Sequence, residues 1–594
     1  MESPTRRDQF INYPSPVQGP KTTYKYIPGT NPVLSGLPLT IASSLVTNLG
    51  PLAGLFWSNA GFGVLRKLDI LNDYEPRYDP TVIPIGDEDH STRNTSEIDH
   101  AGNHQSGIYN YGAAYRSNAT TPRNVVEALL ELIGKDTSKR HEFVSINDEE
   151  VIAAADASTQ RHREGKPIGL LDGIPVAVKD EVHLRNHPQN LGSAQDFTKP
   201  QQDTTWCVRK WQEAGAIVIG KLNMHELGLD TSGNNPITGT PPNPQNPNFY
   251  PGGSSSASAT TVSRGLLPLT LGCDGGGSIR IPSNYCGIYG LKPTHNRVGR
   301  SPATNIASST SVIGPMARCM TDLELGYRVM AAPDIEGKGA SAMFAPPRPM
   351  SKAGSNAASK KRVLGICRQW FDCADPPVLN LCHAALAHFE SSGDYEIIDI
   401  DLPLLHEGQL AHALTILTEI LPSATGSPHR FTAPTSLTLS VGARTTALDF
   451  LLAQKLRNLL MQHLSHLFHS HPGLLIVTPT TPNLGWKIGG PGELVRGLSD
   501  ANMSVRSMTY VWLANFVGCP AISIPVGKAV DEGEGKGLGE VPVGLMAMGE
   551  WGDEGGLIEW GRVGEEYAMG GEEGGKMGRP ADWVDVLEVA KGMR

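Results

Sequence analysis

Several motifs that mark common enzyme classes are absent from this 594-residue chain. It has no G-x-S-x-G, the strand-to-helix turn that carries the nucleophile of α/β-hydrolases, and no G-x-x-x-x-G-K-[ST] for nucleotide phosphates. The zinc-binding sequence H-E-x-x-H is missing as well. These absences argue against an α/β-hydrolase, a P-loop nucleotide hydrolase and a zinc metalloprotease.

Positive charge and paired cysteines are also scarce. Acidic residues outnumber basic ones by 60 to 50, whereas a nucleic-acid-binding surface normally needs a basic excess, so we expect no nucleic-acid partner. None of the eight cysteines forms a C-x-x-C pair, which argues against zinc-ribbon and thioredoxin-like sites. The first ten residues lack the layout of a secretory signal peptide, and we expect a cytoplasmic protein with free thiols.

Charged residues are absent between positions 31 and 65. This stretch, which includes GLPLTIASSLVTNLGPLAGLFW, is long enough to span a bilayer. Pro38, Gly50 and Pro51 interrupt it, and serine, threonine and asparagine dilute its hydrophobicity. The pattern favours packed helices over a transmembrane helix, with peripheral membrane contact through residues 36–57 as a less favoured alternative.

Short apolar runs that alternate with helical patterns predict an α/β fold with a buried sheet. Residues 1–125 are interpreted as a partly helical extension, and residues 345–362 as a surface insertion. Strands are expected within 173–180, 216–221, 266–272, 363–367 and 473–482, and helices within 121–135, 148–166 and 378–393.

Three consecutive glycines precede Ser278 in CDGGGSIRIP, residues 273–282. Glycine within an element costs about 0.5–1 kcal/mol relative to alanine, so three in a row need a reason. One reason is a turn that a Cβ atom would not allow, and another is the approach of bare backbone N–H groups to a ligand. A second serine/glycine turn, YPGGSSSASATT, occupies residues 250–261.

A lysine, Lys179, ends the apolar run GIPVAVKD. Burial disfavours the charged form of lysine and lowers its pKa, which would make the amine available as a base. The alternative is that Lys179 pairs with Asp180 or another carboxylate, and the local sequence leaves both open. His225, in NMHELG, is interpreted as a structural or surface residue, with a smaller chance of catalysis.

Together these three segments resemble the amidase signature family of serine hydrolases. That family has a lysine at the end of a GIPVAVKD strand, a GGSS turn, and GTDTGGSIRIPA followed by CGVVGLKPT. This chain reads GIPVAVKD, PGGSSSASA and GCDGGGSIRIPSNYCGIYGLKPT, and the similarity continues to NFVGCPAISIPVG. It begins near residue 125, which implies that 126–594 form the catalytic domain and that 1–125 lie outside the catalytic apparatus.

The resemblance implies a fold and a set of roles. The fold would be a mixed, twisted β-sheet core covered by α-helices. Ser278 would be the nucleophile, Ser254 would relay its proton after a cis peptide bond with Gly253, and Lys179 would be the base. Such a triad uses no metal and no organic cofactor. The remaining roles are an oxyanion hole made by the backbone of Gly275, Gly276, Gly277 and Ser278, and a bracing pair formed by Asp274 and Arg280.

Two departures from the family pattern stand out. Ser256 and Ala257 replace glycines of GGSSGGSA, and Cys273 replaces a threonine, which we interpret as a small buried substitute. The leading functional interpretation is an amidase that hydrolyses small or acylated amides through a serine acyl-enzyme. The alternatives are the A subunit of a glutamine-dependent tRNA amidotransferase, and a catalytically silent binding or scaffold protein.

Overall fold

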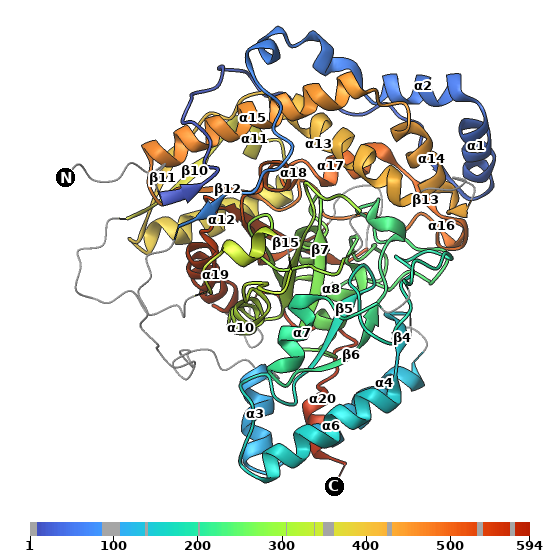
Figure 1. Ribbon diagram of the computed structural model, residues 1–594, viewed down its shortest axis with the longest axis vertical. Helices are drawn as coiled ribbons and strands as arrows, with labels where there is room; N and C mark the ends of the chain where they lie inside the picture. The colour runs from blue at the N-terminus through green and yellow to red at the C-terminus, as the bar shows by residue number, and fades with distance from the viewer. Residues whose placement is uncertain are drawn as a thin grey trace.

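The computed structural model describes residues 9–85, 107–136, 141–199, 202–303, 306–337, 339–347, 361–424, 430–530, 538–570 and 576–593. A mixed sheet of 11 strands forms its centre, and helices surround the sheet (Figure 1). The predicted α/β fold is therefore confirmed. In spatial order the strands are β11 (Tyr395–Asp399), β10 (Arg362–Ile366), β12 (Leu475–Pro479), β15 (Glu540–Met548), β14 (Ala521–Val530), β8 (Tyr289–Lys292), β9 (Val312–Ala317), β7 (Leu269–Asp274), β5 (Pro175–Lys179), β6 (Ile217–Leu222) and β4 (Phe143–Ile146).

The helices follow the periodicity and capping signals of the sequence. Thr121 accepts a hydrogen bond from the backbone of Asn124 at the start of one predicted helix, and Asn147 caps the next in the same way. The larger helices are α1 (Gly36–Asn48), α2 (Gly50–Asn59), α3 (Ile108–Arg116), α4 (Pro122–Lys135), α6 (Asp148–Arg163), α7 (Trp206–Glu213), α8 (Ser256–Ser263), α9 (Arg280–Cys286), α10 (Met320–Met330), α12 (Pro376–Ser391), α13 (Leu405–Ile420), α14 (Ala433–Gly442), α15 (Ala447–Ser470), α17 (Ala501–Ser507), α18 (Trp512–Val517), α19 (Glu554–Met569) and α20 (Val586–Lys591).

Strands β5 and β7 are parallel neighbours, with Val178 of β5 opposite Leu271 of β7. Both strands are buried along their whole length, as expected for their continuous apolar sequences. Because parallel strands end at the same edge of a sheet, Lys179 and the glycine loop after β7 emerge side by side. This edge is where the candidate site forms.

The predicted strands and helices correspond to β5, β6, β7, β10, β12, α4, α6 and α12. Most of the predicted insertion at 345–362 lies outside the described residues, so it stays a prediction. All eight cysteines are free in the described structure.

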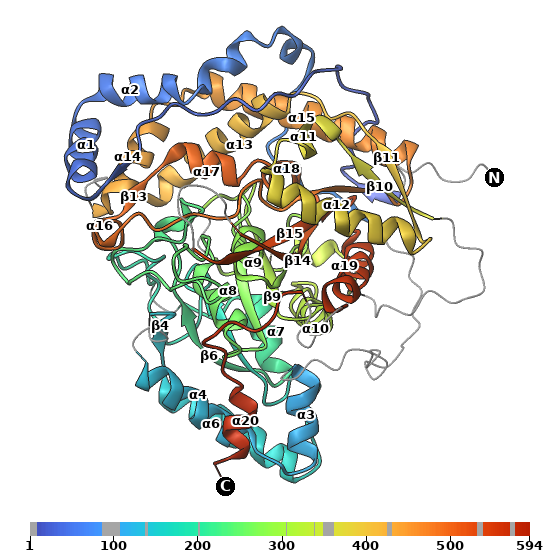
Figure 2. The ribbon, with the colours of Figure 1, turned by 180° about the vertical axis from the view of Figure 1, so that it is seen from behind.

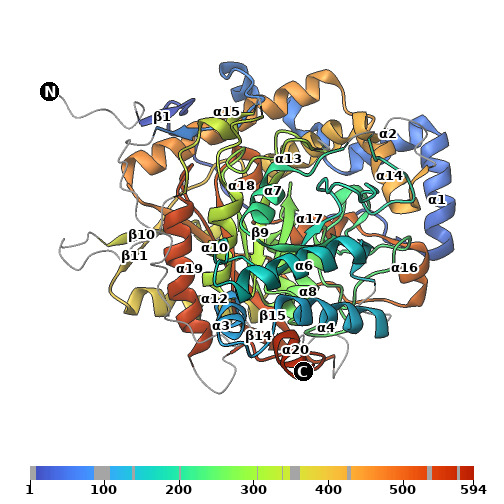
Figure 3. The same ribbon diagram turned by 60° about the horizontal axis from the view of Figure 1, so that its bottom comes forward.

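The N-terminal segment shares the core of the rest of the chain. Trp57, Phe62 and Leu71 belong to the same buried cluster as the side chains of the central sheet. Arg66 binds the carboxylate of Asp449, on α15, through two hydrogen bonds of 2.7 and 2.8 Å. Figures 1 and 2 show α1 and α2 beside α14, while α20 lies against α4 at the opposite end (Figure 3).

Helices α1 and α2 form the uncharged stretch of the sequence. Within the described residues no single helix is long and apolar enough to cross a membrane, and these two pass only as a pair bent by 109°. Their inner side chains pack on Leu437 of α14, which fits the expected packed helices. Their outer faces leave apolar side chains exposed, so peripheral contact stays an untested alternative; these are Leu37, Ile41, Leu45, Leu49 and Leu55.

Removal of residues 1–119 is expected to destabilise the protein, because it uncovers the apolar surface against which Trp57, Phe62 and Leu71 pack. The shortened chain should be insoluble, or should melt several degrees lower and bind the dye ANS. The variant Leu55→Ser, which changes an exposed side chain of α2, serves as the control and should leave the melting temperature unchanged. Equal melting temperatures for the shortened chain and this variant would contradict this view.

Candidate active site

A cavity of about 260 Å³ contains Lys179, Ser254 and Ser278 in its wall. Lys179 ends β5, Ser254 precedes α8, and Ser278 lies in the loop between β7 and α9. All three residues are buried, with Ser278 the most exposed at 8%. The structure thus brings together three residues that the sequence separates by up to a hundred positions.

Lys179 is held by three neighbours. Its Nζ lies 2.8 Å from Ser254 Oγ and donates to the Cys273 carbonyl at 3.4 Å. It also forms an ion pair of 2.9 Å with Glu181 Oε2, and the two side chains are only 1% and 12% exposed. The sequence had left open whether Lys179 would be desolvated or paired with a carboxylate, and the structure shows both.

The carboxylate partner is not the neighbouring Asp180. Asp180 pairs with Lys221 of β6 at 2.7 Å. Strand β5 ends at Lys179, and a hydrogen bond of 3.0 Å from the Val182 amide to the Lys179 carbonyl closes a turn that contains residues 180 and 181. This turn brings Glu181 back to Lys179, and sequence reasoning, which named only Asp180 or another carboxylate, missed Glu181.

The segments that carry the two serines are fixed to each other. The Ser255 amide donates to the Ser278 carbonyl at 3.2 Å, and the Gly253 amide donates to the Thr231 carbonyl at 2.8 Å. The Gly253–Ser254 peptide bond is cis, the form that the family resemblance implied. Ser278 Oγ has no hydrogen-bond partner among the described residues, which leaves it free toward the pocket.

A buried ion pair supports the glycine loop. Arg280 Nε and Nη2 each lie 3.1 Å from a carboxylate oxygen of Asp274, and both side chains are fully buried. Burial alone would raise the pKa of Asp274, but the Arg280 guanidinium, the nearby Lys292 ammonium and the Gly277 N–H hold that pKa below its usual range. Asp274 therefore stays charged and accepts backbone hydrogen bonds from the loop, which is the bracing contact expected of this pair.

The backbone N–H groups of the loop divide into two sets. The Gly277 amide donates to Asp274 Oδ1 at 2.7 Å, and the Ile279 amide donates to Asp274 Oδ2 at 3.0 Å. In the described residues the other three amides have no hydrogen-bond partner, so they alone are available to a ligand: those of Gly275, Gly276 and Ser278. The expected contribution of Gly277 to an oxyanion hole stays a prediction, and in this structure its N–H binds Asp274.

Gly277 is nevertheless required to be glycine. Its φ of +109° lies in the region that side chains disfavour. A Cβ atom there would lie 2.5 Å from Val511 Cγ2, too close for any ordinary contact. The turn requires glycine at position 277, and the two preceding glycines leave their backbone N–H groups exposed to the pocket. Both reasons considered for the triple glycine therefore apply.

Sequence reasoning also missed His412, on α13. Its Nε2 lies 2.8 Å from the Gly275 carbonyl oxygen, and its side chain lines the pocket. The sequence around it, QLAHALTIL, is an ordinary helical pattern that contains no catalytic motif. Only the tertiary packing of α13 over the glycine loop reveals this contact.

Cys273 does not behave as a nucleophile. Burial, followed by the charge of Glu181, raises the pKa of its thiol well above the ordinary value, so the thiol stays neutral. Ser256 and Ala257, the other departures from the family pattern, are fully buried at the start of α8. The interpretation of Cys273 as a small buried substitute is consistent with this structure.

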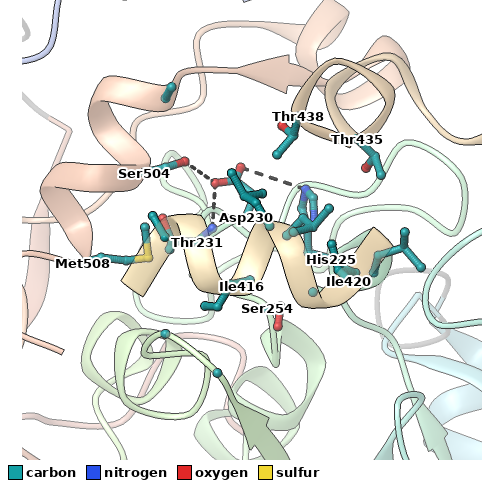
Figure 4. Close-up of a pocket in the computed structure, with 18 of the residues that line it drawn as sticks. His225, Asp230, Thr231, Ser254, Ile416, Ile420, Thr435, Thr438, Ser504 and Met508 are labelled. Carbon is teal, nitrogen blue, oxygen red and sulfur yellow. Dashed lines mark hydrogen bonds and ion pairs between the residues drawn. The ribbon is translucent and has the colours of Figure 1, made fainter. Parts of the chain in front are cut away.

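His225 lies in the pocket but does not reach Lys179. Its backbone amide donates to the Ser254 carbonyl at 3.1 Å, and its Nε2 is 4.0 Å from Asp230 Oδ2. Figure 4 shows the side chains of His225 and Asp230 facing each other, and the Ser504 hydroxyl donates to the other carboxylate oxygen of Asp230. The described residues include no group of three His, Cys, Asp or Glu side chains that could hold a metal ion.

Most of the remaining pocket wall is apolar. Ile416 and Ile420 of α13 face the cavity above Ser254 in Figure 4. Part of the wall comes from the N-terminal segment, through Asn31, Pro32, Phe56, Ala60 and Phe62. The expectation that residues 1–125 lie outside the catalytic apparatus stays a prediction, although this segment contributes part of the pocket wall.

Comparisons with known proteins identify relatives of this chain. The family model for amidases matches residues 124–558. Fatty acid amide hydrolase of Arabidopsis thaliana is 35% identical over 457 residues, which cover 74% of this chain and 73% of that protein. The A subunit of the glutamyl-tRNA(Gln) amidotransferase of Chromohalobacter salexigens is 29% identical over 476 residues, which cover 75% of this chain and 93% of that protein.

A solved structure described as a crystal structure of amidase has 25% sequence identity and a TM-score of 0.65, and the match covers 77% of this chain and 99% of that one. The higher identity to an amide hydrolase favours hydrolysis over the amidotransferase alternative. A family match of this extent also argues against the scaffold alternative. The chain belongs to the amidase signature family and is an amide-hydrolysing enzyme.

Proposed function

We propose that this enzyme hydrolyses amides whose acyl part is a long apolar chain, with Ser278 as nucleophile. The observation that carries this proposal is the apolar wall of the pocket that contains Ser278. Each methylene group moved from water into such a pocket contributes about 0.8 kcal/mol. A relative named fatty acid amide hydrolase supports the same substrate class, whereas a free glutamine side chain would gain little from this wall.

The proposed reaction uses the chain's own side chains. Ser278 Oγ attacks the amide carbonyl carbon and passes its proton to Ser254 Oγ, whose own proton moves to Lys179 Nζ. The N–H groups of Gly275, Gly276 and Ser278 stabilise the negative oxygen of the tetrahedral intermediate. The C–N bond then breaks, the amine leaves with the relayed proton, and water hydrolyses the ester on Ser278 to release the acid.

The ion pair with Glu181 influences whether Lys179 is protonated, and so whether it can act as a base. A carboxylate 2.9 Å from Nζ stabilises the ammonium form, which has no lone pair to accept a proton. Burial of both side chains opposes that charge. We infer that Glu181, through this contact, acts on the reactivity of the Lys179 amine.

Hydrolysis rates are expected to increase with acyl length. Across anilides with acyl chains of about four to sixteen carbons, kcat/KM should rise by more than about 100-fold. Ile420→Trp should remove most of this gain, because the larger ring fills the apolar part of the pocket, and should spare the shortest substrate. Steady-state kinetics with the same aniline leaving group measure this directly.

Two controls accompany the series. Leu448→Trp places the same ring on an exposed position of α15 and should leave the chain-length dependence unchanged. Ser278→Ala should abolish hydrolysis of every anilide. A flat dependence of kcat/KM on chain length in the unmodified enzyme would refute the proposed substrate class.

Glu181→Gln is expected to raise kcat, because it removes the carboxylate that lies 2.9 Å from Lys179 Nζ and favours the ammonium form. Lys179→Ala is the reference variant, and its rate should fall by about 10²–10⁴-fold. Steady-state kinetics of the two variants under the same conditions measure this, and an unchanged kcat in Glu181→Gln would show that Glu181 does not act on the base.

A further inference from the structure

His412 contacts the glycine loop at the peptide that matters for the oxyanion. Its Nε2 lies 2.8 Å from the carbonyl oxygen of Gly275, and its side chain is fully buried. A carbonyl oxygen only accepts hydrogen bonds, so Nε2 carries the proton. Burial lowers the pKa of His412 to about 4, hence the ring is neutral near pH 7 and Nδ1 carries no proton. Nδ1 has no hydrogen-bond partner in the described chain.

One peptide of the glycine loop, between Gly275 and Gly276, can rotate easily. Glycine adopts positive and negative φ with similar ease, so a peptide between two glycines can rotate at little cost. In a trans peptide the C=O and the following N–H point in opposite directions. Rotation of the Gly275–Gly276 peptide would therefore replace the N–H donor of Gly276 by a carbonyl oxygen, which repels a developing negative charge.

The remaining groups of the loop already have fixed partners. The Asp274 carbonyl accepts from Asn515 Nδ2 at 2.8 Å, and the Gly277 amide is bound to the Asp274 carboxylate. These contacts hold the two ends of the loop but leave the Gly275–Gly276 peptide between them unrestrained. In the described structure, His412 makes the one hydrogen bond that fixes that peptide.

The ring also contacts Gly276 sterically. A Cβ atom built on Gly276 would lie 2.9 Å from His412 Cε1. The imidazole thus lies directly over the peptide whose carbonyl it binds. Its own position is set by α13, where Gly408 packs closely on Trp512. The Phe516 ring lies roughly perpendicular to the imidazole, with the two ring centroids 6.1 Å apart.

We propose that His412 is a positioning residue of this enzyme: by holding the Gly275 carbonyl, it keeps the Gly276 N–H directed at the oxyanion. The inference rests on the proposed function, because it assumes that an oxyanion forms at Ser278. His412 does not exchange a proton with the substrate in this account. Its effect belongs to the transition state, so it should appear in kcat and leave KM nearly unchanged.

The test compares His412→Gln with His412→Met. The two side chains have nearly the same length and shape, but only glutamine retains an N–H group that can bind the Gly275 carbonyl. We expect kcat of the methionine variant to fall by about 100-fold, the usual effect of losing one oxyanion donor. The glutamine variant should keep kcat within about tenfold of the unmodified enzyme, and KM should change little in either.

Two further readouts separate positioning from other roles. The pH dependence of kcat should keep its midpoint in both variants, since His412 is not the base; loss of an ionisation would overturn the inference. Amide hydrogen exchange of residues 275–278, followed by mass spectrometry, should be faster in the methionine variant than in the glutamine variant. This measurement needs no turnover, and equal exchange rates would also overturn the inference.

The controls distinguish this inference from the proposed function. His463→Phe removes another buried histidine, on α15, which binds the backbone carbonyl of Asp401 and does not line the pocket, and this change should leave kcat unchanged. If the unmodified enzyme does not hydrolyse acyl anilides, the proposed function is wrong. If it does, and the glutamine and methionine variants have equal kcat, only the role of His412 is wrong.

Discussion

The buried ion pair between Asp274 and Arg280 is the contact on which the site depends. Removing two charges from water is costly, and the cost is recovered only where each charged atom finds close partners. Here the Asp274 carboxylate accepts from Arg280 and from the amides of Gly277 and Ile279. The Asp274 carboxylate thus binds two backbone N–H groups of the loop. The N–H groups of Gly275, Gly276 and Ser278 have no partner among the residues that the structure describes. The ion pair therefore determines which backbone N–H groups of the loop remain available to a ligand.

Helix α13 joins the two halves of the proposed chemistry. One of its residues, His412, binds the glycine loop, while Ile416 and Ile420, one and two turns further along, face the apolar pocket. Helix α14, on which α1 and α2 pack, lies beside α13. One helix therefore contributes to the wall that would receive an acyl chain and contacts the loop that would receive an oxyanion.

The sequence predicted the parts of the site that are encoded locally. The strand ending at Lys179, the glycine turn before Ser278 and the order of the triad residues can be read from short segments, and the family resemblance assigns their roles. Glu181 was not identified, because its contact with Lys179 depends on the turn that follows β5. Nor was His412, because its contact depends on how a helix 134 residues downstream of Ser278 packs. The engaged amide of Gly277 and the pocket wall formed by Phe56 were likewise beyond sequence reasoning, since both depend on three-dimensional contacts.

The central claim is that Ser278 forms the covalent intermediate. A fluorophosphonate carrying a long alkyl chain, allowed to react with the intact enzyme, should leave one adduct per chain, and peptide mass spectrometry should locate it on Ser278. Prior incubation with an acyl amide substrate should slow its formation. An adduct on Ser254, Ser255, Ser256 or Cys273 instead, or an active enzyme that forms no adduct, would contradict the account.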